Sequence, residues 1–177
     1  SNMAKTDIFT GIRRVPFSEG VECGLITFMG EETDVLFLDN VMAQVNDYET
    51  VRKVADDFTM VYTPFHGTGY KFVPEVLRRL GVKKLYCEPE QMKVDGTFPT
   101  VKSPNPENPE GFYLSIALAE KVGADFILGT DPDTDRVGIL VRDSEGKFIA
   151  LNGNETGALM LHYLIGAKRR AGTMPEN

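Results

Sequence analysis

The hydrophobic pattern of the first third of the chain predicts helices and no strand ladder. Apolar side chains recur at helical spacing in residues 31–45, and a second short helix is expected over residues 48–57. The apolar face of the first of these helices consists of Val35, Leu38, Met42 and Val45. Residues 12–30 are punctuated by Pro and Gly and predict irregular structure.

From residue 58 onward, short apolar runs alternate with helical segments. Strands are expected at 58–63, 83–89 and 124–130, and helices at 72–81 and 111–123. Residues 136–143 and 147–151 are expected to form a hairpin. A last helix is expected at 153–170, with Asn152 or Asn154 as its N-cap. The strand–helix–strand order favours parallel pairing through a right-handed crossover. The sequence therefore predicts an α/β fold in which a mixed, largely parallel sheet is flanked by helices, with a helical N-terminal extension.

Residues 88–109 form a long segment without a helix or strand pattern, and five of them are proline. Loops of this length are uncommon inside compact domains, and they tend to be functional or to wrap a neighbouring element. Lys102 in this loop could reach a phosphate, although a rigid wrap over the sheet or an interdomain contact is favoured over a direct role in catalysis.

The composition is that of an ordinary globular protein, and it excludes some classes of partner. Hydrophobic residues make up 42% of the 177 residues, and the net charge of -7 argues against nucleic-acid binding. No apolar run reaches the length of a membrane span, so no membrane partner is expected. Cys23 and Cys87 are too few and too far apart for a disulfide framework or a zinc site, which fits a cytoplasmic protein. Ser1 and Asn2 are interpreted as residues left by tag removal.

Three aspartates at alternate positions, Asp131, Asp133 and Asp135, directly follow the apolar run that ends at residue 130. In an extended chain the first and third would lie about 13 Å apart, at roughly 3.3 Å per residue. The chain must therefore leave the strand and curl if all three bind one cation. An all-oxygen ligand set suits Mg²⁺ better than zinc, and Arg136 could offset the remaining negative charge.

Other interpretations of the acidic loop stay open at this point. A solvated turn with aspartates capping nearby amides is one of them. An EF-hand is disfavoured, because Arg136 stands where that loop needs Gly and Arg142 where it needs Glu. A haloacid-dehalogenase-like phosphatase would use Asp131 as nucleophile and Asp133 as acid/base, but that family has Thr or Val at the position of Asp135. A non-catalytic module that binds sugar phosphate or metal is a further possibility.

The turn TPFHGTG, residues 63–69, also lies between a predicted strand and a predicted helix. Gly67 and Gly69 would allow backbone amides to face an anion at the helix N-terminus. The turn is not a P-loop, because the Gly-Lys-Ser/Thr ending is absent. His66 is a candidate phosphate ligand, and a packed or capping histidine is at least as consistent with these residues.

Four segments in order, VYTPFHGTG, DGTFPTVKSPNPENPEG, GTDPDTDRVG and LNGNETGAL, resemble the α-D-phosphohexomutases, the family of phosphoglucomutases and phosphomannomutases. The resemblance implies a four-domain enzyme of which this chain is a piece. Residues 1–55 would be the helical tail of the first domain, 56–150 the α/β metal-binding domain, and 151–177 the first helix of the following domain.

The resemblance also implies a mechanism and a set of site residues. Mg²⁺ would be held by Asp131, Asp133 and Asp135, and Asp135 and Arg136 would lie against the phosphoserine and the bisphosphorylated sugar. The nucleophilic serine lies outside this chain, so no catalytic residue is assigned here. The expected partners are a hexose phosphate substrate, its bisphosphate intermediate and the missing domains of the same polypeptide. We expect the chain alone to be inactive, with exposed apolar side chains at Leu36, Leu38, Leu161 and Leu164 where those domains would dock.

Overall fold

The structure is a computed structural model that describes residues 5–175. The residues interpreted as left by tag removal, Ser1 and Asn2, lie outside the described range. The chain forms two compact units, with the division between Phe37 and Leu38.

The first unit contains helix α1, Phe17–Glu22, and the beginning of α2, Glu31–Met42, which continues into the second unit. The prediction of irregular structure throughout residues 12–30 is wrong at α1. This helix follows Pro16, and only one of its six residues, Gly20, is buried. Six residues are too short a window for hydrophobic periodicity to indicate a helix.

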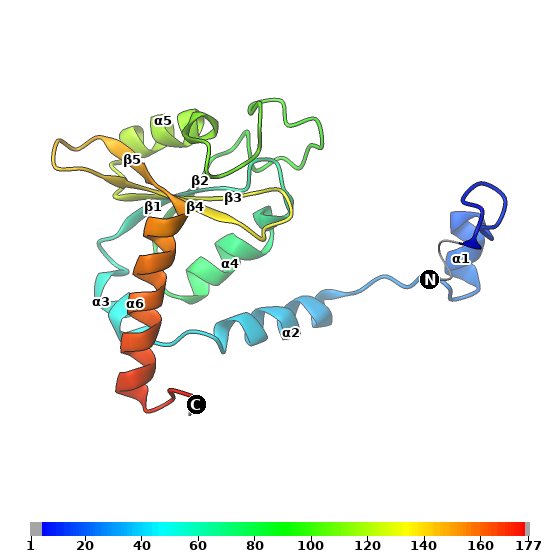
Figure 1. Ribbon diagram of the computed structural model, residues 1–177, viewed down its shortest axis with the longest axis horizontal. Coiled ribbons are helices and arrows are strands. Elements are labelled where there is room, and N and C mark those ends of the chain that lie inside the picture. The colour runs from blue at the N-terminus through cyan, green and yellow to red at the C-terminus, as the bar shows by residue number, and fades with distance from the viewer. Residues whose placement is uncertain (1–4, 176–177) are drawn as a thin grey trace. The chain divides into compact units, whose positions relative to one another are not determined.

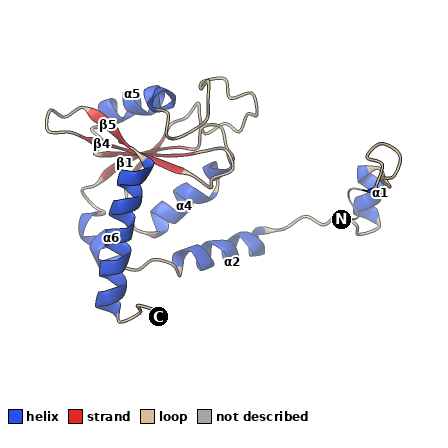
Figure 2. Ribbon diagram, in the orientation of Figure 1, coloured by secondary structure: helices blue, strands red, loops and turns tan. Residues whose placement is uncertain are grey.

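Within the described residues, five strands form one mixed sheet in the order β2-β1-β3-β4-β5 (Figures 1 and 2). The strands are β1 Thr59–Thr63, β2 Lys84–Cys87, β3 Phe126–Thr130, β4 Val137–Arg142 and β5 Phe148–Leu151. Strand β1 pairs in parallel with β2 on one side and β3 on the other, whereas β3, β4 and β5 are joined in antiparallel fashion. The mixed sheet predicted from the sequence is confirmed.

Helices connect the parallel strands and cover both faces of the sheet. The helices are α3 Tyr48–Val54, α4 Phe72–Arg79, α5 Tyr113–Val122 and α6 Gly153–Ala171, with short 3₁₀ turns at Thr68–Tyr70 and Pro109–Phe112. Figure 1 shows α5 on one face and α4 on the other. Helix α6 begins with a capping box in which Asn152 and Glu155 exchange hydrogen bonds, so Asn152 is confirmed as the N-cap.

The hydrophobic core lies between α5 and the sheet. It consists of Val61, Phe65, Val101, Phe112, Ala119, Ala124, Ile127 and Leu140. All five residues of β1 are buried, because this strand has a neighbour on each side. The unbroken apolar character of residues 58–63 is therefore explained by the central position of β1.

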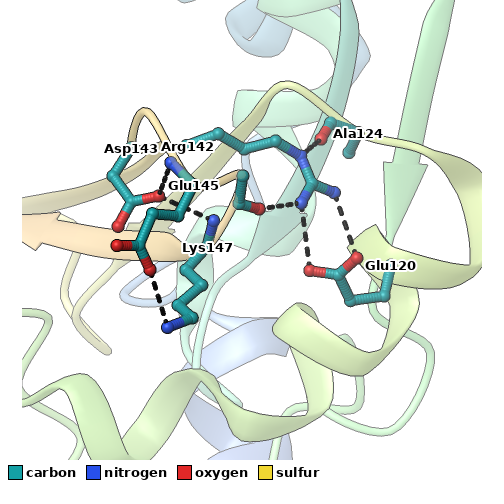
Figure 3. A network of polar contacts seen from close by, with 7 residues as sticks. Glu120, Ala124, Arg142, Asp143, Glu145 and Lys147 are labelled. Carbon is teal, nitrogen blue, oxygen red and sulfur yellow. Dashed lines mark hydrogen bonds and ion pairs between the residues drawn. The ribbon is translucent and has the colours of Figure 1, made fainter.

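Arg142 ties the β4–β5 hairpin to the end of α5 (Figure 3). Its Nε donates to the carbonyl of Ala124 at 2.8 Å and its Nη1 to the carbonyl of Gly146 at 2.6 Å. The guanidinium also pairs with Glu120 and lies 4.2 Å from the centre of the Phe148 ring. Arg142 thus adds polar contacts between the antiparallel half of the sheet and α5 to the apolar packing of Leu140 in the core.

Exposed apolar side chains follow the expectation in part. Leu36 and Leu161 are exposed, as predicted, but Leu38 is buried and Leu164 is partly covered. The end of α6 lies beside the segment around α3, where Arg170 of α6 pairs with Asp47 just before α3. None of the helices in the described part of the chain is long and apolar enough to cross a bilayer.

Candidate functional site

Two loops meet at one edge of the sheet because the strands that precede them are parallel neighbours. Strands β1 and β3 run side by side, with Thr63 opposite Gly129, so the segments that follow both strands leave at the same edge. The amide and the hydroxyl of Thr68 both donate to the carbonyl of Pro132, at 2.8 and 3.0 Å. The turn at residues 63–69 therefore packs directly on the acidic loop, and ligands of α/β sheets are commonly bound at such an edge.

Gly67 makes this close approach possible. A Cβ atom at this position would collide with the backbone of Pro132, so only glycine fits. Thr134, beyond Pro132 in the acidic loop, adopts a left-handed conformation with φ of 67°. Its hydroxyl lies 3.2 Å from that of Thr68, and its amide donates to the carbonyl of Asp131. The acidic loop is consequently a tight turn that the neighbouring turn supports.

The bend predicted for the acidic loop is present, and it brings the three aspartates together. One carboxylate oxygen from each of Asp131, Asp133 and Asp135 lies within 4.8 Å of the others. Asp131 is fully buried, whereas the other two side chains are exposed. Two oxygens on opposite sides of a Mg²⁺ ion are about 4.2 Å apart, at 2.0–2.1 Å each. The all-oxygen donor set therefore suits a hard divalent cation, which would draw the three oxygens closer together than they are here.

Arg136 determines how the buried carboxylate is held. Its backbone amide donates to Asp131 Oδ1 at 3.0 Å, and its Nε donates to Oδ2 at 2.7 Å. The same Nε lies 3.6 Å from Asp135 Oδ1. One positive charge thus faces three negative charges, which leaves the loop anionic.

The pKa values of the two flanking aspartates are shifted in opposite directions. Burial by itself would raise the pKa of Asp131, but the hydrogen bonds from the amide and guanidinium of Arg136 together lower it below its usual value. Repulsion from Asp133 is the largest cause that raises the pKa of Asp135. The loop therefore has one carboxylate that is stabilised as an anion and one that is destabilised until a positive charge arrives.

A family model described as phosphoglucomutase/phosphomannomutase, alpha/beta/alpha domain II, matches residues 36–146. The chain belongs to the phosphoglucomutase/phosphomannomutase family. Phosphoglucomutases of Staphylococcus epidermidis (strain RP62A) and Staphylococcus aureus (strain MRSA252) are 43% and 42% identical to it over 109 residues. That alignment covers 62% of this chain and 20% of each relative, so the chain spans about a fifth of the length of the curated relatives it matches.

Solved structures of the family show similarity at lower identity. A phosphomannomutase candidate from Thermus thermophilus has 20% identity and a TM-score of 0.48, covering 60% of this chain and 23% of that one. A phosphoglucomutase/phosphomannomutase family protein from Burkholderia thailandensis has 22% identity and a TM-score of 0.42, covering 69% and 29%. The residues matched by the family model include the turn at 63–69, the long loop and the acidic loop, and they end before α6.

The structure places the two further candidate residues, His66 and Lys102, on either side of Thr100, which bonds the His66 ring and lines the same pocket as Lys102. His66 is buried, and its ring nitrogens lie 2.8 Å from the carbonyl of Lys93 and 2.9 Å from the hydroxyl of Thr100. Lys102 is exposed and lines a separate pocket of about 260 Å³ together with Tyr113. Neither residue is among the groups that meet the aspartates directly, and contact of either one with a phosphate remains a prediction.

Sequence reasoning missed the polar residues that support the acidic loop. Thr68 contacts it, and the hydroxyls of Tyr62 and Thr130 bond to each other at 2.9 Å beneath Gly69. Burial raises the pKa of Tyr62. A signal for Thr68 was present, because two predicted parallel strands were followed by turns that would emerge at one edge. No local pattern indicated the pair of Tyr62 and Thr130.

Proposed function

We propose that this chain supplies the magnesium-binding loop of a phosphohexomutase, most specifically a phosphoglucomutase, that interconverts sugar 1-phosphates and 6-phosphates. The observation that carries the proposal is the convergence of Asp131, Asp133 and Asp135 beside Arg136 at the edge where two loops meet. The family membership and the identity of about 42% to phosphoglucomutases support the choice of reaction.

Each residue of the loop has a distinct part in the proposed chemistry. The three carboxylates would hold Mg²⁺, which supplies charge stabilisation to a phosphoryl group during its transfer. Asp131 is the anchored ligand, because Arg136 fixes both of its oxygens. Arg136 has five N–H donors and is 56% exposed, so it can bind Asp131 and still donate to a phosphoryl oxygen.

The remaining parts of the catalytic apparatus would come from the rest of the polypeptide. We propose residues 1–55 as the tail of a preceding domain, 56–150 as the metal-binding domain and 151–177 as the opening of the next. The phosphoserine nucleophile, the bisphosphate intermediate and the sugar-binding groups belong to the missing domains in this proposal. Exposed apolar residues on α6, such as Met160 and Leu161, support a docking face there.

The free thiols of Cys23 and Cys87 fit a cytoplasmic location.

Metal binding is tested by calorimetric titration of the chain with Mg²⁺ and Mn²⁺. We expect weak binding, and Asp133→Asn should raise the dissociation constant at least about tenfold, a loss of ~1.4 kcal/mol. Glu145→Gln is the matched control, because it removes the same charge from an exposed hairpin residue that pairs with Lys147 away from the site. Equal affinity of the Asp133→Asn variant and the wild-type chain would refute the metal site.

Catalysis is tested separately with the 177-residue chain. We expect no interconversion of glucose 1-phosphate and glucose 6-phosphate in a coupled dehydrogenase assay, because no nucleophilic serine loop occurs in the sequence. Steady phosphate release from p-nitrophenyl phosphate would instead favour the phosphatase interpretation. The match of residues 36–146 to the phosphoglucomutase/phosphomannomutase family model weighs against that interpretation.

A further inference from the structure

Every polar group of His66 is bonded to the long loop that follows β2. Its amide donates to the carbonyl of Gln91 at 2.8 Å, and its carbonyl accepts from the amide of Asp95 at 3.2 Å. Its ring bonds to the Lys93 carbonyl and the Thr100 hydroxyl. Four bonds from one buried residue to residues 91–100 fasten the turn at 63–69 to this loop.

The chemistry of the partners fixes the direction of these bonds. A carbonyl oxygen can only accept, so Nδ1 of His66 donates to Lys93, and in the neutral ring Nε2 accepts from the Thr100 hydroxyl. The Thr100 oxygen in turn accepts from the side-chain amide of Gln91 at 3.1 Å. The oxygen of that amide accepts from the hydroxyl of Thr63, the last residue of β1, at 2.6 Å. A continuous chain of hydrogen bonds therefore runs from the end of β1 to His66.

The backbone at this point needs such support. Phe65 and His66 both adopt left-handed conformations, with φ of 46° and 65°. Residues other than glycine rarely adopt this conformation, and they keep it only where the surroundings impose it. The Phe65 ring packs against Phe112 with their centres 4.9 Å apart, and the four bonds hold His66. The two left-handed residues precede Gly67 and Thr68, which contact Pro132 of the acidic loop.

We propose that His66 is a positioning residue for the acidic loop. By fastening the long loop to the turn at 63–69, it holds Gly67 and Thr68 against Pro132 and so keeps the three carboxylates converged before a cation binds. This role rests on the proposed metal site and extends it. It also assigns a task to residues 91–100, which act as a scaffold for the site without contacting the cation.

The first experiment measures the affinity of the chain for Mn²⁺ alone by calorimetry. His66→Ala and Thr100→Val should each raise the dissociation constant, about tenfold or more for His66→Ala. His66→Asn should recover part of the affinity, because its amide can still donate to the Lys93 carbonyl. His162→Ala replaces the second histidine, which is exposed on α6, and should leave the affinity unchanged.

The second experiment measures amide hydrogen exchange in the metal-free chain, so it does not depend on the metal site. The amides of Asp131 and Thr134 should exchange about tenfold faster in His66→Ala than in the wild-type chain, because the loop loses its support. Ala119→Gly weakens the buried face of α5 and the hydrophobic core that it shares with Phe65, but it removes no hydrogen bond of His66, so it serves as the control for general destabilisation.

The outcomes separate the two proposals. If the wild-type chain does not bind Mn²⁺, the metal site is refuted, and the exchange rates still decide whether His66 positions the loop. Unchanged exchange at Asp131 and Thr134 in His66→Ala overturns the positioning role, as does an equal acceleration in Ala119→Gly at matched stability. If His66→Ala does not fold, the same criteria apply to the isosteric variant Thr100→Val.

Discussion

Asparagine substitution at Asp131 and at Asp135 should change the stability of the metal-free chain in opposite directions. Asn at position 131 keeps one oxygen to accept a bond from Arg136, but it turns an NH₂ group toward that arginine and loses the other bond. A hydrogen bond to a charged group contributes about 1.5–3 kcal/mol. Because the Arg136 side chain is 56% exposed, solvent screening reduces this, and we expect a loss of about 1–2 kcal/mol.

The change in stability is expected to have the opposite sign at Asp135, because the carboxylate of Asp135 is repelled by the neighbouring carboxylates. Its raised pKa means that the folded metal-free chain binds a proton there more tightly than the unfolded chain does. Removing the charge should therefore be neutral or stabilising at pH 7. In contrast, both Asp131→Asn and Asp135→Asn should weaken the binding of Mg²⁺. Wild-type chain at ten times its dissociation constant should gain about 1.4 kcal/mol from the ion, and both variants should gain less.

The stability of Asp131→Asn relative to the wild-type chain should also depend on pH. The pKa of Asp131 in the folded chain is lowered from the ordinary value of 3.8. The stability that the ionised carboxylate contributes is therefore fully present above the unfolded pKa, and it is lost as the pH falls through the folded pKa. The difference in the free energy of unfolding between the wild-type chain and Asp131→Asn should be largest at pH 7 and should shrink below about pH 4.

Urea unfolding with chelator and with excess Mg²⁺ measures these differences. Far-UV circular dichroism is the suitable signal, because the chain contains no tryptophan. Equal stability of Asp131→Asn and wild type without metal would refute the anchoring of Asp131 by Arg136. A destabilisation by Asp135→Asn of the same size would refute the repulsion argument.

Three further substitutions test the fold around the site, each by urea unfolding at pH 7. Ser115→Ala should be neutral or should stabilise by up to about 1 kcal/mol, because the Ser115 hydroxyl is buried without a hydrogen-bond partner among the described residues; a clear loss would reveal a missing partner. Gln91→Leu should cost about 2–6 kcal/mol, because it leaves a buried threonine hydroxyl and the Gly111 carbonyl unsatisfied, and a cost below about 1 kcal/mol would contradict the network. Arg142→Met should cost about 1–3 kcal/mol, because it leaves the Ala124 carbonyl without its hydrogen bond. Thermal unfolding of the hairpin is the second measurement. No change in stability would show that the Arg142 contacts in Figure 3 are dispensable.

Much of the second unit could be predicted from local patterns. The apolar runs gave β1 and β3, and the helical periodicity gave α5 and α6 within a few residues. Helix α1 was missed because six residues are too short a window for hydrophobic periodicity to indicate a helix. The long loop was recognised as unusual from its prolines, but its bonds to His66 were not foreseen. Those bonds join residues about 30 positions apart in the sequence, and hydrophobic periodicity does not predict hydrogen bonds at that separation.

The amino-acid sequence alone determined the order of strands and helices, the three aspartates with Arg136, and the resemblance to phosphohexomutases. These features are local, because side-chain periodicity and short motifs depend on neighbours along the chain. The tertiary structure decided that β1 and β3 lie side by side, which places Thr68 on the acidic loop across more than 60 residues of sequence. It also decided that Asp131 is buried while Asp133 remains exposed. Burial and hydrogen-bond partners are set by which distant segments pack together, so only the folded chain assigns different tasks to otherwise identical carboxylates.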